Sequence, residues 1–224
     1  MLSIRLLAPL VLCALTACAR PAQRPQPLAP APIPNLGAVK QDIRDYRSSG
    51  RWEADIRQVA DECFAFAEGA RATVARPAVV FDIDETLLSN WQYEIDDDFA
   101  RSIPLFHTWA LRAACTPIDP VKRFYVTMRE EGVACFVITG RRESLRAATE
   151  ENLRRVGLDG WQGIAFQPAG YESPSIVPFK SGERAKIERQ GYTIVANIGD
   201  QESDLEGGHA VHVCKVPNPM YLIP

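Results

Sequence analysis

The stretch VVFDIDETLLSN, residues 79–90, joins an apolar run to two aspartates, Asp82 and Asp84, that lie two positions apart. A continuous apolar run is typical of a strand buried inside a parallel sheet. Ligands of open α/β sheets bind just beyond the carboxyl ends of such strands, where these aspartates lie. Two adjacent carboxylates repel each other unless a cation binds between them or one of them has a raised pKa and is protonated. Carboxylate oxygens are also ligands that Mg²⁺ prefers. The stretch therefore predicts an α/β fold with a magnesium site.

A second apolar run, residues 133–138, leads directly into Thr139, Gly140 and Arg141. A hydroxyl at the end of a strand, followed by glycine and a helix start, offers one Oγ donor and free backbone N–H groups to a phosphate. Arg141 has two interpretations: it contacts a phosphoryl group or substrate, or it lies on the surface of a helix predicted over residues 142–156. Thr-Gly turns are common, so this signal depends on its position after the aspartate pair.

A third apolar run, residues 193–198, leads into a Gly-Asp-x-x-x-Asp string that contains Asp200 and Asp204. Glycine permits a tight turn at the strand end, which brings Asp200 to the edge of the sheet that carries Asp82. Asp204 lies one turn further along, where it can reach the same cation through water or hold a lysine. An acidic pair in a turn is most often solvated. The interpretation of Asp200 and Asp204 as site residues therefore depends on their position after the first two motifs.

Taken in order, these motifs resemble those of the haloacid dehalogenase (HAD) superfamily of phosphohydrolases. The longer string FDIDETLLSN, from Phe81 to Asn90, is similar to the branch that includes plant acid phosphatases and bacterial class B and class C acid phosphatases. The resemblance covers about 190 residues and includes the tail 216–224. It implies a Rossmann-like fold, with a central parallel sheet flanked by helices and a small helical cap inserted after the first strand. It also implies one motif lysine, for which Lys180 fits better than Lys186.

The resemblance implies a Mg²⁺-dependent acid phosphatase that hydrolyses phosphomonoesters through an aspartyl-phosphate. Asp82 would be the nucleophile and Asp84 the general acid and base. Mg²⁺ would be held by the Asp82 and Asp200 carboxylates and the Asp84 main-chain carbonyl, with Asp204 in support. The residues expected to bind the phosphoryl oxygens are Thr139, Gly140, Arg141 and Lys180.

Two other functions stay open at this point. A phosphotransferase of the same superfamily would use the same residues with an alcohol acceptor. A non-catalytic binding or storage lipoprotein is disfavoured because the nucleophile position, Asp82, is intact. Nucleoside monophosphates are plausible substrates by analogy alone. The expected partner is therefore a small phosphomonoester, and the oligomeric state stays undetermined.

The N-terminus predicts export and a lipid anchor. Residues 1–17 have a short positive region followed by an apolar run too short to span a bilayer. Leu-Thr-Ala-Cys, ending at Cys18, resembles a bacterial lipobox, in which the cysteine is lipidated; an ordinary signal peptide with a chance cysteine is the alternative. Ala19 favours the outer membrane, facing the periplasm or the cell surface. Residues 18–34 are a proline-rich linker.

The remaining chain, residues 35–224, is expected to form one phosphatase domain. Helical periodicity predicts an N-terminal helical arm over residues 35–77. The segment 91–124 is too long for a simple connection and predicts a cap insertion beside the site. Its aromatic residues would stack on a nucleobase or aryl group, or form the core of the cap itself; they are Trp91, Tyr93, Phe99, Phe106 and Trp109.

The charge and the cysteine content bear on possible partners, disulfides and zinc binding. The chain has 224 residues and a net charge of -3, without a long basic run, so nucleic acid is not an expected partner. Four cysteines follow the anchor: Cys63, Cys115, Cys135 and Cys214. They permit three full pairings in an oxidising compartment, and Cys135 also fits a buried thiol. None has the spacing of a zinc site.

Overall fold

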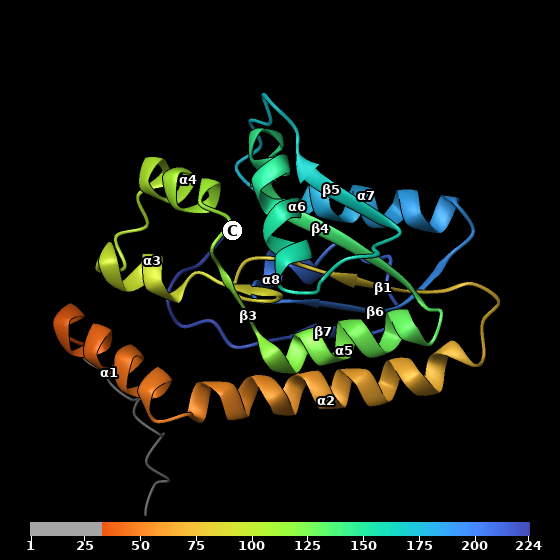
Figure 1. Cartoon of the computed structure of the whole chain (residues 1–224), viewed down its shortest axis with the longest axis horizontal. Coiled ribbons are helices and arrows are strands. Elements are labelled where there is room, and N and C mark those ends of the chain that lie inside the picture. Colours follow the sequence, from red (N-terminus) through yellow and green to blue (C-terminus); the bar gives the residue numbers. More distant parts are fainter. Residues whose placement is uncertain (1–32) are drawn as a thin grey trace, which may run out of the picture. The chain divides into compact units, whose positions relative to one another are not determined.

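Five parallel strands form the central sheet, in the order β5-β4-β1-β6-β7 (Figure 1). The computed structural model describes residues 33–224, and the statements below concern that part of the chain. The strands are β1 (Pro77–Phe81), β4 (Ala134–Arg142), β5 (Gly163–Gln167), β6 (Thr193–Gly199) and β7 (Val213–Lys215). The predicted α/β fold with a central parallel sheet is confirmed. The first, second and third apolar runs form β1, β4 and β6, which are adjacent in the sheet.

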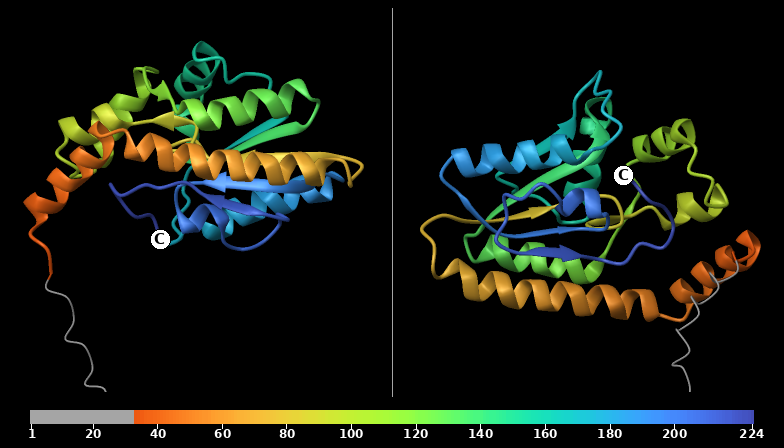
Figure 2. Two further views of the ribbon diagram at one scale, coloured as in Figure 1. Left: turned by 90° about the horizontal axis from the view of Figure 1, so that it is seen from below. Right: turned by 180° about the vertical axis from the view of Figure 1, so that it is seen from behind.

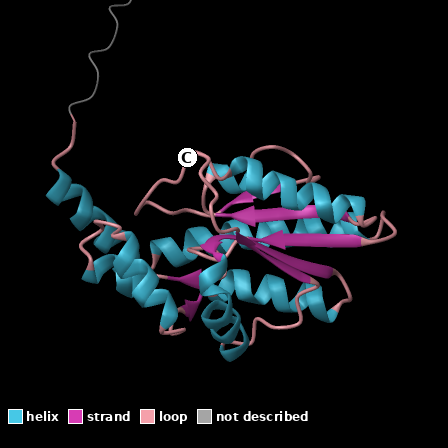
Figure 3. Ribbon diagram, turned by 90° about the horizontal axis from the view of Figure 1, so that it is seen from above, coloured by secondary structure: helices cyan, strands magenta, loops and turns pink. Residues whose placement is uncertain are grey.

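Helices cover both faces of the sheet (Figure 3). On one face α2 (Arg51–Arg71) and α5 (Asp119–Glu130) pack against the side chains of Val79 and Phe81. On the other face α7 (Val177–Arg189) packs against Val80. Alternate residues of β1 thus enter two separate cores, which is why the sequence is apolar without interruption rather than alternating. The long helix α2 runs across the sheet in both views of Figure 2.

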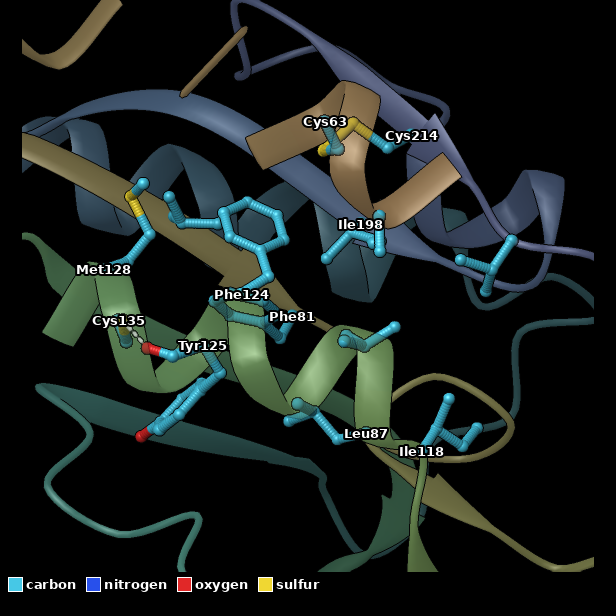
Figure 4. Close-up of a cluster of buried hydrophobic side chains, with 14 of the residues drawn as sticks. Cys63, Phe81, Leu87, Ile118, Phe124, Tyr125, Met128, Cys135, Ile198 and Cys214 are labelled. Carbon is cyan, nitrogen blue, oxygen red and sulfur yellow. Dashed lines mark hydrogen bonds between the residues drawn. A yellow bond between two sulfur atoms is a disulfide. The ribbon is translucent and has the colours of Figure 1, made fainter. Parts of the chain in front are cut away.

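The larger core contains a disulfide that joins α2 to the edge strand β7 (Figure 4). Cys63 and Cys214 are bonded across 151 residues of sequence, whereas Cys115 and Cys135 are buried free thiols. None of the three full pairings therefore forms, and Cys135 is the buried thiol that its apolar surroundings indicated. Closing so long a loop stabilises the folded state by roughly 4–5 kcal/mol in the chain-entropy account.

The predicted cap segment contains two short helices, α3 (Trp91–Asp96) and α4 (Ile103–Leu111). The short strands β2 (Leu88–Ser89) and β3 (Thr116–Pro117) pair antiparallel at its base. Helix α5 already begins at Asp119, so the last residues of the segment 91–124 belong to a helix that covers the sheet. Most aromatic side chains of the segment contact one another or helix α1 (Leu36–Ser48), as Trp91 does with Phe99 and Tyr93 with Phe106.

The boundaries of other elements differ slightly from the predicted ones. Strand β4 continues to Arg142, so the helix expected from residue 142 is a 3₁₀ turn, η1 (Glu143–Leu145), followed by α6 (Arg146–Arg155). Helix α1 (Leu36–Ser48) precedes α2, and α8 (Glu202–Leu205) follows β6. The predicted signal peptide, Cys18 and most of the linker lie outside the described residues. Within residues 33–224, no helix is long and apolar enough to cross a membrane.

Candidate active site

Three charged side chains from separate parts of the chain form a buried cluster at the carboxyl ends of β1 and β6. Asp82 follows β1, Lys180 lies on α7, and Asp204 lies on α8. Lys180 Nζ donates to Asp82 Oδ1 at 2.6 Å and also to Asp204 Oδ1. Burial raises the pKa of Asp82 to about 7, because the attraction of Lys180 is countered by the neighbouring carboxylates. The cluster therefore holds more negative charge than one ammonium group neutralises.

Asp200 adds a third carboxylate to this cluster. Asp82, Asp200 and Asp204 each offer an oxygen within 4.8 Å of the other two, and all three residues are buried. Burial, together with Asp204 and Asp82, raises the pKa of Asp200 well above its ordinary value. A buried set of oxygen ligands with excess negative charge suits a hard divalent cation. The residues present therefore fit a divalent metal site.

Asp84 forms an ion pair with Arg141 rather than with Lys180. The Arg141 guanidinium donates to Asp84 Oδ1 at 2.7 Å from Nη2 and to Oδ2 at 3.2 Å from Nε. Thr149 on α6 accepts a further bond from Arg141, and Asn90 donates to Asp84. Burial acts to raise the pKa of Asp84, but Arg141 and Asn90 outweigh it and lower the pKa below its ordinary value. The structure thus holds Asp84 ionised.

The predicted phosphate cradle lies where β4 meets the cavity. Thr139 is fully buried, and its Oγ1 accepts a hydrogen bond from the backbone N–H of Arg141 at 3.1 Å. Gly140 and Arg141 both line the cavity that also contains Asp82 and Asp84. Arg141 is buried, so the surface-helix interpretation does not apply; its guanidinium donates to Asp84 and Thr149.

A cavity of about 310 Å³ opens above these residues. Its floor carries the four aspartates of the two acidic motifs. One wall comes from the α3–α4 segment and includes Arg101 and Phe106, and the C-terminal tail contributes Tyr221. The aromatic side chains lie close to the charged groups: Tyr221 donates to Glu85, and the Arg141 guanidinium lies 5.7 Å from the centroid of the Phe106 ring. The cavity therefore offers charged and aromatic groups side by side to one substrate.

Sequence reasoning missed the residues that orient the aspartates. Asn218 in the tail donates to Asp200 Oδ2 at 2.6 Å, and Tyr221 donates to Glu85 at 2.9 Å. Glu85 lies between the motif aspartates and the tail, has a positive φ of 54°, and accepts hydrogen bonds from Asn90. The only signal for these roles was the resemblance of the tail 216–224, which assigned no role to any residue in it.

The structure places Lys180, and not Lys186, beside the carboxylates. Both residues lie on α7, but Lys180 is buried whereas Lys186 is exposed and pairs with Glu183. They are six residues apart, so their side chains point to different sides of the helix. Helix geometry thus separates two lysines that sequence left as alternatives.

Comparisons with known proteins agree with this geometry. A family model described as HAD superfamily, subfamily IIIB (acid phosphatase), matches residues 27–224. Acid phosphatase 1 from Solanum lycopersicum is 30% identical over 186 residues, which are 81% of this chain and 73% of that protein. Vegetative storage protein 1 from Arabidopsis thaliana is 31% identical over 191 residues, which are 83% of this chain and 70% of that protein.

A solved structure shares the fold. The class C acid phosphatase from Bacillus anthracis, solved with tungstate bound, superposes with a TM-score of 0.69 at 22% identity. The superposition covers 82% of this chain and 86% of that one. The expected HAD fold is therefore confirmed, with the parallel sheet and flanking helices described above.

Proposed function

The chain belongs to subfamily IIIB of the HAD superfamily and is an acid phosphatase, a phosphomonoesterase; we propose that it is Mg²⁺-dependent and acts through an aspartyl-phosphate on Asp82. The observation that carries this proposal is the buried cluster of Asp82, Lys180, Asp200 and Asp204 on the floor of the cavity. A phosphate ester is the small-molecule substrate.

Asp82, Asp200 and Asp204 supply the carboxylates that would hold Mg²⁺, and the main-chain carbonyl of Asp84 is proposed as a further ligand. Oxygen ligands are what Mg²⁺ prefers, and the raised pKa values of Asp82 and Asp200 indicate negative charge that a cation would relieve. When bound, the ion supplies charge neutralisation for the transferring phosphoryl group. Lys180 offsets charge at the same point through its bond to Asp82.

Asp82 is the proposed nucleophile. Its Oδ1 accepts from Lys180, whereas no protein group in the described part of the chain donates to its Oδ2. Oδ2 would bond to phosphorus as the bond from phosphorus to the ester oxygen breaks. The Thr139 hydroxyl, the backbone N–H groups that follow it and Lys180 would bind the non-bridging oxygens. Asp82 is thereby converted into an aspartyl-phosphate.

Asp84 is the proposed general acid and base. It would give a proton to the leaving alkoxide, and then take one from the water whose oxygen bonds to phosphorus. That second step breaks the bond from phosphorus to Asp82 and releases phosphate. Arg141 keeps Asp84 ionised in the free enzyme, which is the form that accepts a proton. Proton donation needs the protonated form, which acidic solution favours.

The decisive experiment is hydrolysis of 4-nitrophenyl phosphate by the soluble chain lacking residues 1–34. We expect activity with Mg²⁺ and its loss in EDTA. We expect Asp82→Asn to lower kcat by more than about 10³-fold, because a carboxamide cannot form the covalent intermediate. A radiolabelled phosphomonoester should leave label on acid-quenched enzyme but none on Asp82→Asn.

Asp61→Asn is the matched control, since Asp61 is exposed on α2 and does not line the cavity. It should retain normal kcat, and circular dichroism should show that both variants fold. Appreciable Mg²⁺-dependent turnover by folded Asp82→Asn would contradict the nucleophile assignment.

Nucleoside monophosphates are a proposed substrate group within this class. The aromatic side chains of Phe106 and Tyr221 in the cavity wall could stack on a base. Adenosine 5′-monophosphate and ribose 5-phosphate differ only by the base, so their kcat/KM ratio measures its contribution. A ratio near one would exclude base recognition.

The N-terminal anchor is a separate proposal that rests on sequence alone. The family match begins at residue 27, beyond Cys18, so the catalytic segment does not include the lipobox-like string. We expect labelled fatty acid to be incorporated at Cys18 and the full chain to fractionate with the outer membrane. Cys18→Ser should abolish both while sparing phosphatase activity; persistence of either would contradict the anchor.

A further inference from the structure

Arg101 differs from Lys180 and Arg141, two other cations of the cavity, in what it contacts. Lys180 donates to two carboxylates, and Arg141 makes a forked ion pair with Asp84. The contact of Arg101 with Glu94 is longer, 3.8 Å from Nη1 to Oε1, beyond hydrogen-bond range. Its guanidinium lies over the Tyr221 ring, 3.3 Å from the centroid, in a cation–π contact. Arg101 therefore faces the cavity with donors left to offer.

The backbone that carries Arg101 is held in an unusual conformation. In the loop between α3 and α4, Asp98, Phe99 and Arg101 all have positive φ values, of 48°, 58° and 54°. Such values are strained for residues with a Cβ atom and persist where surrounding contacts impose them. Here Asp97 Oδ2 accepts a bond from the backbone N–H of Ser102 at 2.7 Å, inside the same loop.

Helix α1 contacts this loop from outside. Lys40 and Arg44 form ion pairs with Asp98 at 2.7 and 2.8 Å, and Arg44 also lies over the Phe99 ring. The N-terminal arm and the loop's own hydrogen bonds thus maintain one backbone conformation. That conformation directs Arg101 to the cavity rather than to solvent; its side chain is 26% exposed.

The charge distribution of the cavity indicates what Arg101 would bind. The acidic residues that line the cavity are Asp82, Asp84, Asp200 and Asp204, all of them in the two acidic motifs at the floor. Within residues 33–224, the walls carry Arg101 and Arg142 and no Asp or Glu side chain. A planar guanidinium matches a carboxylate or phosphate with two parallel hydrogen bonds. The Arg101 side of the cavity therefore suits an anionic group of the substrate.

We infer that Arg101 is a specificity-determining residue that binds a second anionic group, carboxylate or phosphate, on the leaving group of the phosphomonoester. This inference rests on the proposed function, because it assigns the leaving-group end of the same cavity. Substrates with a second anion would span the cavity, with the scissile phosphate at Asp82 and the other anion at Arg101.

The test compares 3-phosphoglycerate with glycerol 3-phosphate, which share a three-carbon skeleton and a primary phosphate ester. They differ in a carboxylate against a hydroxymethyl group at the other end. We expect the wild-type enzyme to favour 3-phosphoglycerate by about tenfold in kcat/KM, the worth of one charge-assisted hydrogen-bond pair at a partly exposed site. Arg101→Gln should reduce that ratio to near one, and Arg101→Lys should retain part of it.

Arg112→Gln is the matched control, because Arg112 is exposed at the end of α4 and does not line the cavity. It should leave the ratio unchanged. If Arg101 only supports the loop, Arg101→Gln will lower kcat/KM for both substrates equally and leave the ratio intact, which overturns the inference. A wild-type ratio near one overturns it as well.

Failure of the proposed function and failure of the Arg101 inference would give different results. Absence of turnover with 4-nitrophenyl phosphate and both glycerol derivatives would contradict the proposed function and, with it, the role of Arg101. Turnover of all three with an unchanged substrate ratio in folded Arg101→Gln would contradict the role of Arg101 alone.

Discussion

Two three-membered ion clusters in this protein have similar contacts and opposite surroundings. In one, Lys180 lies between Asp82 and Asp204 at the floor of the cavity; in the other, Asp98 lies between Lys40 and Arg44 on the outside of the α3–α4 loop. The Lys180 side chain is 5% exposed, whereas that of Asp98 is 63% exposed. The two clusters therefore differ in their exposure to solvent and not in the distances between their charged atoms.

This difference in exposure means that similar ion-pair contacts have different energetic and functional consequences in the two clusters. Water and salt screen the Asp98 cluster, so breaking it has little energetic consequence even though it orients a loop. The buried cluster has no such screening: removing one member leaves uncompensated charge in a low-dielectric site. A buried cluster of this kind is suited to bind a metal and a phosphoryl group, whose charges it complements.

The largest expected effect comes from breaking the buried cluster. Lys180→Met removes the ammonium but keeps most of the volume, and leaves Asp82 and Asp204 facing each other. We expect the free energy of unfolding, measured with urea in EDTA, to fall by about 3–5 kcal/mol. Phosphatase kcat should fall by about 10²–10³-fold.

Lys186→Met, on the same helix, tests whether the position or the residue type matters. Lys186 is exposed, so the change should alter the unfolding free energy by less than about 0.5 kcal/mol and spare kcat. Similar losses in the two variants would show that burial is not what distinguishes the clusters.

The next effect is stabilisation of the buried cluster by metal. If Asp82, Asp200 and Asp204 hold Mg²⁺ in the folded state only, Mg²⁺ at a hundred times its Kd should raise the unfolding free energy by about 2.7 kcal/mol. Asp200→Asn should remove most of that increase. An equal increase in Asp200→Asn would place the Mg²⁺ elsewhere.

Glu94 offers an intermediate case, a buried carboxylate whose cationic neighbour Arg101 lies 3.8 Å away. Its Oε2 has no hydrogen-bond partner, and burial together with Glu85 raises its pKa from 4.5 to about 7. The folded state therefore binds more protons than the unfolded state between these values, so Glu94 lowers stability increasingly as pH rises through that window. Above about pH 7 the cost is complete.

Glu94→Gln should remove this cost. We expect the variant to be more stable than wild type by about 2 kcal/mol at pH 8, with the difference vanishing near pH 4, in urea unfolding at each pH. Glu130→Gln, at an exposed position on α5, should show no such trend. A difference independent of pH would show that Glu94 ionisation is not its source.

The smallest effect is expected from the exposed cluster. Asp98→Asn removes the charge while keeping a side chain that tolerates left-handed backbone, so the loop conformation is retained. The loss of stability should be barely measurable at low salt and absent at high salt. A loss as large as that of Lys180→Met would overturn the contrast between the clusters.

The parallel sheet and the positions of the acidic motifs could be predicted because both are local patterns. An apolar run followed by Asp82, or by Asp200, places each carboxylate at a strand end, and parallel strands share that edge. The resemblance favoured Lys180 over Lys186, but local pattern alone could not decide between them, because the two lysines lie on different faces of α7. The pairing of Cys63 with Cys214 could not be predicted either, because it depends on α2 crossing the sheet to its last strand.

By itself the sequence determined the order of strands and motifs along the chain, because hydrophobic runs and turn residues act over a few positions. Only the tertiary structure decided that Arg141 holds Asp84, that Asn218 and Tyr221 of the tail orient Asp200 and Glu85, and that Arg101 faces the cavity. These contacts join residues far apart in sequence, so they depend on how helices and loops pack around the sheet rather than on any local pattern.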